Sequence, residues 1–487
     1  MQNQAQLIAY VDRLTGGTFR DLERLLAGPL SGAFGGVHVL PFFHPIDGAD
    51  AGFDPIDHTV VDPRLGTWDD VRALARQTDV MADVIVNHVS SRSPQFEDYL
   101  QGGANSRSAG MFLTYSHVFP HGACEADLLA LHRLRHDLPF TTYRIAQEEV
   151  VLWTTFTRQQ IDIDVHHAEG RRYLDAVLTQ FHHAGIRAIR LDAVGFAVKK
   201  AGTSCFMIPE TLAFISEFTA RAHALEIEVL VETHAHHLEQ IRMARQVDWI
   251  YDFALPPLVL HTLYTRDATP LTRWLDVRPR NAITVLDTHD GIGVRDAADL
   301  LSGDAIDAIV ETIHERSGGE SREASGGAAQ NLDVSQVNCT FYDALGRRDD
   351  AYLVARAVQC FVPGIPQIYY VGLLAGSNDM ALLRRTGVGR DINRHYYAMG
   401  EVQQELRRPV VQSLLSLLML RNTHPAFAGA FTVKSMAPTG LAMEWRDGDA
   451  WATLDVSLTD MSASVTCSRR DADRRGEVAW SSERRPT

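Results

Sequence analysis

IRAIRLDAVGFAVKK, residues 186–200, starts with alternating apolar side chains and then turns charged. Its first half predicts a buried strand, and Arg190 and Asp192 lie two residues apart at the end of that strand. Side chains two apart on a strand point to the same face, so the guanidinium and the carboxylate point the same way. The pair is therefore either a structural ion pair or part of an active site.

Seven other short apolar runs follow the same design along the chain. They are QLIAYVDRL (6–14), GGVHVLPFF (35–43), VMADVIVNH (80–88), IEVLVETH (227–234), VDWIYDFAL (247–255), AITVLDTHD (282–290) and VPGIPQIYYVG (362–372). Amphipathic stretches such as TLAFISEFTARAHAL (211–225) separate them, and this alternation is typical of a parallel sheet covered on both faces. Eight such strands predict an α/β protein built on a closed (β/α)8 barrel, the TIM-barrel fold.

Polar residues gather at the carboxyl ends of these predicted strands. They are Asn87, His88, Asp192, Glu232, Thr233, His234, His289 and Asp290. In a barrel of this kind the active site lies where the strands end and the following loops begin. The predicted site is therefore this rim.

Two irregular stretches and a change of pattern near the end predict additions to the barrel. We assign the barrel to residues 1–85, 167–291 and 347–426, an inserted subdomain to 86–166 after the third strand, a second insertion to 292–346 after the seventh strand, and a small C-terminal antiparallel β domain to 427–487. SGGESREASGGAAQ (317–330) is rich in Gly, Ser and Ala, which predicts that the second insertion is a mobile lid. The last fifteen or so residues predict a frayed end.

Charge and composition exclude several classes of partner. The 487 residues include 46 basic and 61 acidic side chains, and the net charge of -15 opposes binding to nucleic acid or to an anionic membrane. The N-terminal residues lack the pattern of a signal peptide, and SLLSLLML (413–420) is far shorter than a membrane span. Five cysteines without a C-x-x-C pair suit a reducing compartment. We expect a soluble cytoplasmic protein.

Asp192, Glu232 and Asp290 end three different predicted strands, so barrel closure would bring them around one cavity. Cleavage of a glycosidic bond uses such a set of groups. One carboxylate attacks the anomeric carbon, one carboxylic acid protonates the leaving oxygen, and negative charge stabilises the oxocarbenium-like transition state. Burial and neighbouring carboxylates would keep the acid protonated, while Arg190 would keep the nucleophile ionised. The three carboxylates therefore favour glycosyl transfer.

Four motifs resemble, in order, the signature of glycoside hydrolase family 13, the α-amylase family. They are DVIVNH (83–88), IRLDAV (189–194), VET (231–233) and THD (288–290). The resemblance implies Asp192 as nucleophile, Glu232 as general acid/base and Asp290 as transition-state stabiliser. The sugar-holding residues that it implies are His88, Arg190 and His289.

Longer segments resemble one group within that family, the sucrose phosphorylases, over nearly the whole chain except its last sixty or so residues. They include GVHVLPFFHPIDGADAGFDPIDH (36–58), LDAVGFAVKKAGTSCFM (191–207), NLDVSQVN (331–338) and GRDINRHYY (389–397). The resemblance implies retaining transfer of glucose from sucrose to inorganic phosphate. The products would be α-glucose 1-phosphate and fructose, and no cofactor or metal is implied.

The same resemblance implies a wider set of substrate-binding residues. They are Asp50, Phe53, Arg135, Asp333, Val334, Ser335, Gln336 and Arg390. Asp50 and Arg390 would close the far end of the glucose pocket, and Phe53 would stack on the sugar. Asp333 and Gln336 on the predicted lid would meet fructose. Arg135 would bind phosphate, which an acidic protein must meet with a local cation. A homodimer is left open.

Four acceptor-side positions depart from the pattern of sucrose phosphorylases. Phe196, His132 and Ser335 stand where a tyrosine is usual, and Leu134 stands where a proline is usual. The catalytic trio is untouched, so these departures concern the leaving group and the acceptor. The alternative is a related phosphorylase that acts on sucrose 6'-phosphate, glucosylglycerol or glucosylglycerate.

Other classes of protein compete with this interpretation. His234, His236 and His237 would suit a metal-dependent barrel hydrolase, but a metal site needs ligands that converge from several strands. A calcium ion at Asn87 would lack a nearby run of acidic ligands. SGGESREASGGAAQ lacks the G-x-x-x-x-G-K-[ST] motif of a phosphate-binding loop. A non-catalytic carbohydrate-binding barrel would be marked by loss of a carboxylate, and all three are present.

Overall fold

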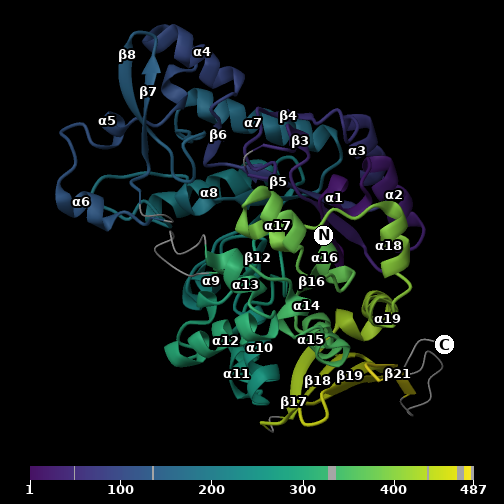
Figure 1. Ribbon diagram of the computed structural model, residues 1–487. Coiled ribbons are helices and arrows are strands. Elements are labelled where there is room, and N and C mark those ends of the chain that lie inside the picture. Colours follow the sequence, from purple (N-terminus) through teal and green to yellow (C-terminus); the bar gives the residue numbers. More distant parts are fainter. Residues whose placement is uncertain (49, 134–136, 327–335, 436–437, 469–476, 484–487) are drawn as a thin grey trace.

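The computed structural model of the chain describes residues 1–48, 50–133, 137–326, 336–435, 438–468 and 477–483. Its centre is a closed barrel of eight parallel strands (Figure 1). In order around the barrel they are β1 (Gln6–Ala9), β2 (Gly36–Val39), β5 (Asp79–Ile85), β10 (Ala188–Asp192), β11 (Glu228–Val231), β12 (Trp249–Asp252), β13 (Ala282–Thr284) and β16 (Ile365–Tyr369). Each strand lies within one of the eight apolar runs, except that β5 begins one residue before its run, so the predicted (β/α)8 barrel is confirmed.

The strand register places the strand ends at one rim. β10 pairs with β5 so that Asp192 lies opposite Ile85, and with β11 so that Leu191 lies opposite Val231. Parallel strands run in the same direction, so the residues beyond these positions meet at the carboxyl end of the barrel. Glu232, which follows Val231, therefore lies beside Asp192 at that rim.

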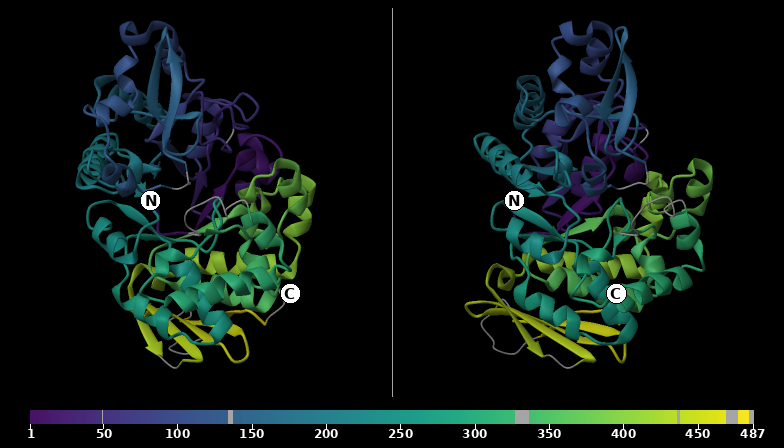
Figure 2. Two further views of the ribbon diagram at one scale, coloured as in Figure 1. Left: turned by 60° about the vertical axis from the view of Figure 1, so that its left-hand side comes forward. Right: turned by 90° about the vertical axis from the view of Figure 1, so that its left-hand side faces the viewer.

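Helices outside the barrel connect the strands (Figures 1 and 2). They are α1 (Val11–Thr15), α2 (Phe19–Ala27), α3 (Trp68–Ala75), α7 (Ala168–His183), α8 (Pro209–His223), α9 (His237–Met243), α10 (Leu255–Thr265), α11 (Thr269–Val277), α14 (Phe341–Ala344), α15 (Asp349–Phe361), α16 (Tyr370–Leu373), α17 (Met380–Thr386), α18 (Met399–Glu405) and α19 (Pro409–Thr423). This layer also contains three short 3-10 turns and one two-stranded sheet. The turns are η3 (Val194–Phe196), η6 (Gly389–Asn393) and η7 (Pro425–Ala428), and the strands of the sheet are β3 (Phe43–His44) and β4 (Asp57–Val61). None of the helices in the described ranges is both long and apolar enough to cross a membrane.

The segment between β5 and α7 forms the part of the molecule drawn above the barrel in Figures 1 and 2. It contains β6 (His88–Ser90), α4 (Pro94–Gly102), η1 (Gly103–Asn105), η2 (Ala109–Met111), α5 (Tyr115–Val118), α6 (Glu125–Ala130), β7 (Phe140–Ile145), β8 (Glu148–Trp153) and β9 (Gln160–Asp162). β7 and β8 form an antiparallel hairpin, while β9 pairs with β6 and so leads the chain back to the barrel.

The segment between β13 and α14 contains β14 (Ile292–Gly293), η4 (Arg295–Ala297), α12 (Gly303–Arg316), α13 (Glu320–Ser325) and β15 (Gln336–Val337). β14 and β15 pair antiparallel, so the two ends of the segment lie side by side. Residues 327–335, which include the last four residues of SGGESREASGGAAQ (317–330), lie outside the described residues, while α13 lies within the described part of that stretch.

The C-terminal part is an antiparallel sheet of five strands, as the sequence predicts. The strands are β17 (Ala430–Ser435), β18 (Gly440–Asp447), β19 (Ala450–Ser457), β20 (Ser462–Cys467) and β21 (Glu477–Ser481). Trp480 on β21 is buried and donates from its indole nitrogen to the Ser413 carbonyl of α19 at 2.9 Å. The expectation of a frayed end is therefore wrong at β21, because an indole anchors that strand to the barrel.

We propose to keep the division of the chain at residues 86–166, 292–346 and 427–487. Each of these ranges begins after a barrel strand or a barrel helix and holds small sheets that pair within the range or with its immediate border. Limited proteolysis followed by mass spectrometry of the fragments would test the boundaries.

Candidate active site

Asp192, Glu232 and Asp290 lie at the carboxyl-end rim of the barrel. Asp192 is the last residue of β10, Glu232 follows β11, and Asp290 follows β13 across a short loop. Their side chains keep 13–14 % of their surface exposed. Each carboxylate is thus nearly buried but still accessible to a bound molecule.

One guanidinium connects two of these carboxylates. Arg190 Nη1 donates to Asp192 Oδ1 at 2.8 Å, and Arg190 Nη2 lies 3.9 Å from Glu232 Oε1. Nη1 also donates to Asp83 Oδ1 at 2.6 Å, and the other oxygen of that buried aspartate lies 3.0 Å from His38 Nε2. The predicted pair of Arg190 and Asp192 is therefore formed, and it lies within the group of carboxylates.

The pKa of Asp290 is well below its usual range. Burial alone would raise this pKa, but the nearby charges of His289 and Arg390 outweigh burial. Arg390 Nη1 lies 2.8 Å from Asp290 Oδ1, and His289 Nε2 lies 3.3 Å from Asp290 Oδ2. Asp290 is therefore an anion throughout the physiological pH range.

Asp192 shows the opposite shift. Burial raises its pKa well above the usual range, the Arg190 charge opposes this, and the Glu232 carboxylate adds to it. The sequence predicts that Arg190 keeps Asp192 ionised, and in the structure burial works against this effect.

The residues predicted to hold glucose line the same rim. Phe53 stacks on His289, with ring centroids 4.8 Å apart and planes 8° apart. His88 Nε2 lies 3.0 Å from the Phe53 carbonyl oxygen, and Gln160 Nε2 donates to Asp50 Oδ2 at 3.1 Å. Four segments that are far apart in the sequence are thus in contact beside the carboxylates.

The structure describes only part of the predicted acceptor side. Arg135, Asp333, Val334 and Ser335, and also Leu134, lie outside the described residues. Gln336 is described: its side-chain amide lies 2.9 Å from Nε2 of His234, two residues beyond Glu232. The structure therefore brings one residue of the predicted lid next to His234, two residues beyond Glu232.

Aromatic rings from the insertion and from the loop after β10 pack together on this side. His132 stacks on Phe206 with centroids 4.4 Å apart, and Phe196 contacts both of these rings, at 5.7 and 4.7 Å. Phe156 lies edge-on to Phe196 at 5.4 Å. Two of the positions that depart from the usual pattern, His132 and Phe196, are thus neighbours.

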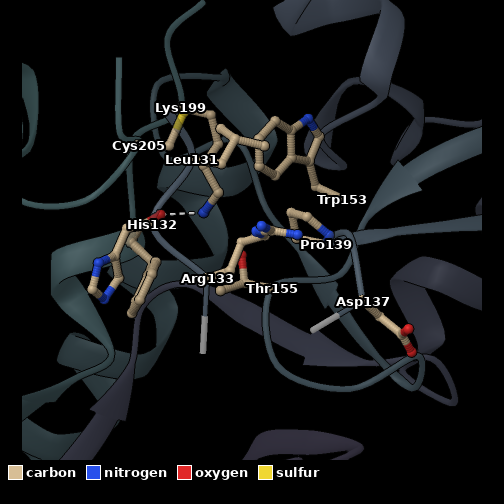
Figure 3. A pocket seen from close by; sticks show the side chains of 10 residues that line it. Leu131, His132, Arg133, Asp137, Pro139, Trp153, Thr155, Lys199 and Cys205 are labelled. Atoms are coloured by element: carbon tan, nitrogen blue, oxygen red, sulfur yellow. Dashed lines mark hydrogen bonds between the residues drawn. The ribbon is translucent and has the colours of Figure 1, made fainter. Parts of the chain in front are cut away.

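A buried lysine lies behind these rings, in the pocket that Figure 3 shows. Lys199 Nζ lies 2.8 Å from Asp162 Oδ2 on β9 and donates to Asn87 Oδ1 at 2.9 Å. The same ammonium donates to the Phe196 carbonyl and lies 5.7 Å from the Trp153 ring. The side-chain oxygen that the sequence offers as a calcium ligand at Asn87 thus accepts a hydrogen bond from a lysine.

The three histidines of THAHH have separate partners. His234 Nδ1 lies 3.1 Å from Asp296 Oδ2, His236 Nε2 lies 2.9 Å from Asp299 Oδ2, and His237 Nδ1 lies 3.1 Å from the Ala298 carbonyl. Within the described part of the chain, no three His, Cys, Asp or Glu side chains are grouped as a metal site requires. These imidazoles contact one loop and do not converge on one point.

Sequence reasoning missed several residues of this site. They are Phe156, Gln160, Asp296 and Arg394. Gln160 begins β9 and Asp296 lies in η4, while Phe156 precedes β9 and Arg394 follows η6. None of them stands at the carboxyl end of a predicted barrel strand, where the sequence marks the site. His234 stands out in the sequence as a possible metal ligand, but the structure places it beside Glu232 and Gln336.

The chain is similar to known enzymes over almost its full length. Residues 33–248 match the family described as alpha amylase, catalytic domain. The chain is 57 % identical over 476 residues to a sucrose phosphorylase from Agrobacterium vitis, covering 96 % of this chain and 98 % of the relative. It is 49 % identical over 463 residues to a sucrose phosphorylase from Bifidobacterium adolescentis, covering 93 % and 92 %. A crystal structure of sucrose 6F-phosphate phosphorylase from Thermoanaerobacter thermosaccharolyticum superposes with a TM-score of 0.92 at 37 % identity, covering 98 % of each chain.

Proposed function

Since the chain belongs to the sucrose phosphorylase family of α-amylase-type enzymes, we propose that it transfers glucose from sucrose to inorganic phosphate. The products are α-D-glucose 1-phosphate and D-fructose, and the anomeric configuration is retained. The observation that carries this proposal is the Arg190 guanidinium set against Asp192 and Glu232 at the barrel rim. That geometry places a nucleophile and an acid side by side at the rim of the barrel.

In the first half of the reaction, a carboxylate oxygen of Asp192 attacks the anomeric carbon of glucose. The bond from that carbon to the fructose oxygen breaks, and the carboxylic acid of Glu232 gives its proton to the departing oxygen. Arg190 favours this distribution of charge, because it is hydrogen-bonded to Asp192 and 3.9 Å from Glu232. Fructose leaves, and the glucosyl group remains as an ester on Asp192.

In the second half, a phosphate oxygen attacks the same anomeric carbon from the side that fructose has left. Glu232, now ionised, takes the proton of that hydrogen phosphate, and the ester bond to Asp192 breaks. Two inversions give net retention. Asp290 carries fixed negative charge next to the sugar and stabilises the oxocarbenium-like transition state in both halves.

The residues beside the carboxylates hold the glucosyl ring. We assign this role to Asp50, Phe53, His88, His289 and Arg390, in addition to Arg190. Phe53 presents a ring face that His289 supports from behind. The carboxylate of Asp50 is oriented by the Gln160 amide, so it accepts hydrogen bonds from sugar hydroxyls.

The acceptor side remains a proposal from the sequence. Asp333, Val334, Ser335 and Gln336 meet fructose, and Arg135 meets phosphate. The observation that favours a second candidate, a phosphorylase with a different leaving group, is the position of His132 and Phe196, whose rings both contact Phe206. Its substrates would be sucrose 6'-phosphate, glucosylglycerol or glucosylglycerate.

Product analysis separates these possibilities. The protein is incubated with sucrose with and without phosphate, and glucose 1-phosphate, glucose and fructose are assayed; Asp192→Asn serves as the inactive control. Phosphate-dependent glucose 1-phosphate from sucrose is the expected result. The reverse reaction, from glucose 1-phosphate with fructose, fructose 6-phosphate, glycerol or glycerate, ranks the acceptors. A phosphorylated fructose, glycerol or glycerate preferred by tenfold or more over fructose would replace sucrose in the proposal.

Two further expectations belong to this proposal. We place the enzyme in the cytoplasm, where its cysteines stay as thiols; four of them are buried in the structure and Cys124 is exposed. A homodimer is left open, and light scattering coupled to gel filtration would determine the oligomeric state.

A further inference from the structure

His234 lies between the acid/base position and a second, buried carboxylate. Its Nδ1 is 3.1 Å from Asp296 Oδ2, and its Nε2 is 3.6 Å from Glu232 Oε1. The ring stacks on Phe253 with centroids 4.1 Å apart and planes 15° apart, which fixes its orientation. The side chain of His234 is 27 % exposed, so a bound molecule can reach it.

The surroundings of Asp296 hold its carboxylate against the imidazole of His234. The carboxylate is 4 % exposed, and its other oxygen accepts a hydrogen bond from Gln240 Nε2 at 3.3 Å. Gly293 on β14 passes close by, and a side-chain carbon there would lie 3.0 Å from Asp296 Oδ2. A side chain at Gly293 would therefore crowd the carboxylate of Asp296, which has His234 as its cationic partner.

The charges that face His234 are mostly negative. Glu232 at the end of β11, Asp290 after β13 and Asp296 on η4 all favour its protonated form. Gln336 on β15 and Phe253 after β12 are neutral, and a nearby cation is Arg190, whose Nη2 lies 3.9 Å from the same Glu232 oxygen that faces His234. Burial would lower the pKa of His234, but the charge of Asp296 and its hydrogen bond to the ring raise this pKa to about 9.

The contact with Gln336 is compatible with a doubly protonated ring. The amide of Gln336 lies 2.9 Å from His234 Nε2. The oxygen and nitrogen of an amide are interchangeable in such a position, so the amide oxygen can accept the Nε2 proton.

We propose that Asp296 is a positioning residue that keeps His234 doubly protonated beside Glu232, so that the acceptor side carries a fixed positive charge when phosphate enters. The inference rests on the proposed function. Phosphate arrives as an anion at a site that already holds ionised Glu232 and Asp290, and the imidazolium offsets their repulsion. Water is neutral and needs no such cation. Loss of the charge therefore lowers phosphate attack more than it lowers hydrolysis of the glucosyl-enzyme.

The chain offers a matched pair of variants for the test. Asp296→Asn keeps the shape of the side chain but removes the charge, and Asp299→Asn does the same to the Asp299 carboxylate that faces the neighbouring His236 on the surface. The ratio of glucose 1-phosphate to glucose, formed from sucrose and phosphate, is measured from pH 6 to pH 8.5. We expect the ratio of the parent and of Asp299→Asn to stay level, and that of Asp296→Asn to fall about tenfold between pH 6.5 and pH 8, as an ordinary imidazole deprotonates.

A second measurement does not depend on turnover. The pKa of His234 is followed by NMR in protein with labelled histidine, and His234→Gln assigns the resonance. A titration near pH 9 in the parent supports the inference, even if Asp296→Asn does not fold. If the parent forms no glucose 1-phosphate but His234 titrates near pH 9, the proposed function fails and the inference about the charge stands. A parent pKa near 6.5, or a product ratio in Asp296→Asn that follows that of Asp299→Asn at every pH, would overturn the inference.

Discussion

Asp192 has the most direct test at the scale of single residues. Asp192→Asn preserves the size of the side chain, but an amide cannot form the glucosyl ester. We expect transfer from sucrose to fall by a factor on the order of 10⁴ or more. Initial rates of glucose 1-phosphate formation measure the loss, and an unchanged circular dichroism spectrum shows that the fold is intact. Near-normal turnover would remove Asp192 from the mechanism.

Glu232→Gln should behave differently with different donors. The amide cannot protonate a leaving oxygen, so sucrose cleavage should be almost abolished. α-Glucosyl fluoride has a leaving group that needs little protonation, and this donor should still form the ester on Asp192. A burst of fluoride release measures that first step. Equal losses with sucrose and with the fluoride would contradict the role of Glu232 as acid.

Arg135 belongs to the same scale, although its role rests on resemblance alone. If it binds phosphate, Arg135→Ala should weaken phosphate use more than sucrose cleavage. Loss of one charge-assisted contact costs about 1.5 to 3 kcal/mol, so the ratio of phosphorolysis to hydrolysis should drop about tenfold or more. Arg133→Ala, two residues away, serves as a comparison. An unchanged ratio in Arg135→Ala would show that phosphate is bound by other groups.

At the scale of elements, Lys199 links the insertion to the barrel. Its ammonium is 1 % exposed, and its partners are Asp162 on β9 and Asn87 after β5. Lys199→Met leaves Asp162 buried without a cation, which should lower the free energy of unfolding by about 3–5 kcal/mol. Lys200→Met removes only an exposed pair with Glu210 and should change it by less than about 1 kcal/mol. Urea unfolding measures the free energy of unfolding of the two variants. Equal stabilities would show that the contacts of Lys199 do not contribute this much.

The barrel strands are easier to predict from the sequence than the contacts between the segments that connect them. Each barrel strand is buried on both faces, so it appears as an apolar run, and the polar residues at its end mark the rim. Gln160 on β9 and Asp296 on η4 lie far from Asp50 and His234 in sequence. Only closure of the barrel brings these pairs together, and no local pattern encodes them. The same holds for Trp480. Its contact with α19 anchors β21, and no local pattern in the sequence indicates that contact.

At the scale of the whole molecule, stability should decline on both the acid and the alkaline side. Asp83 is fully buried, and burial would raise its pKa, but the charges of His38 and Arg190 lower that pKa to about 2. A carboxylate with a lowered pKa stabilises the fold above the ordinary value of 3.8 and loses this contribution as pH falls towards 2. Asp83 should therefore account for about 2 kcal/mol of stability lost between pH 4 and pH 2.

The decline of stability on the alkaline side depends on His234, whose pKa is raised to about 9. A histidine with a raised pKa contributes its full stabilisation below the unfolded-state value of 6.5 and loses it as pH rises through 9. The free energy of unfolding should therefore fall progressively from pH 6.5 to pH 9.5 in the parent. Asp296→Asn returns that pKa towards 6.5, so its stability should be lower at neutral pH and nearly level over the same range. Urea unfolding at half-unit pH steps measures both curves. Parallel curves for the two proteins would mean that another group titrates in this pH range, because only the imidazole beside Asp296 is changed by the substitution.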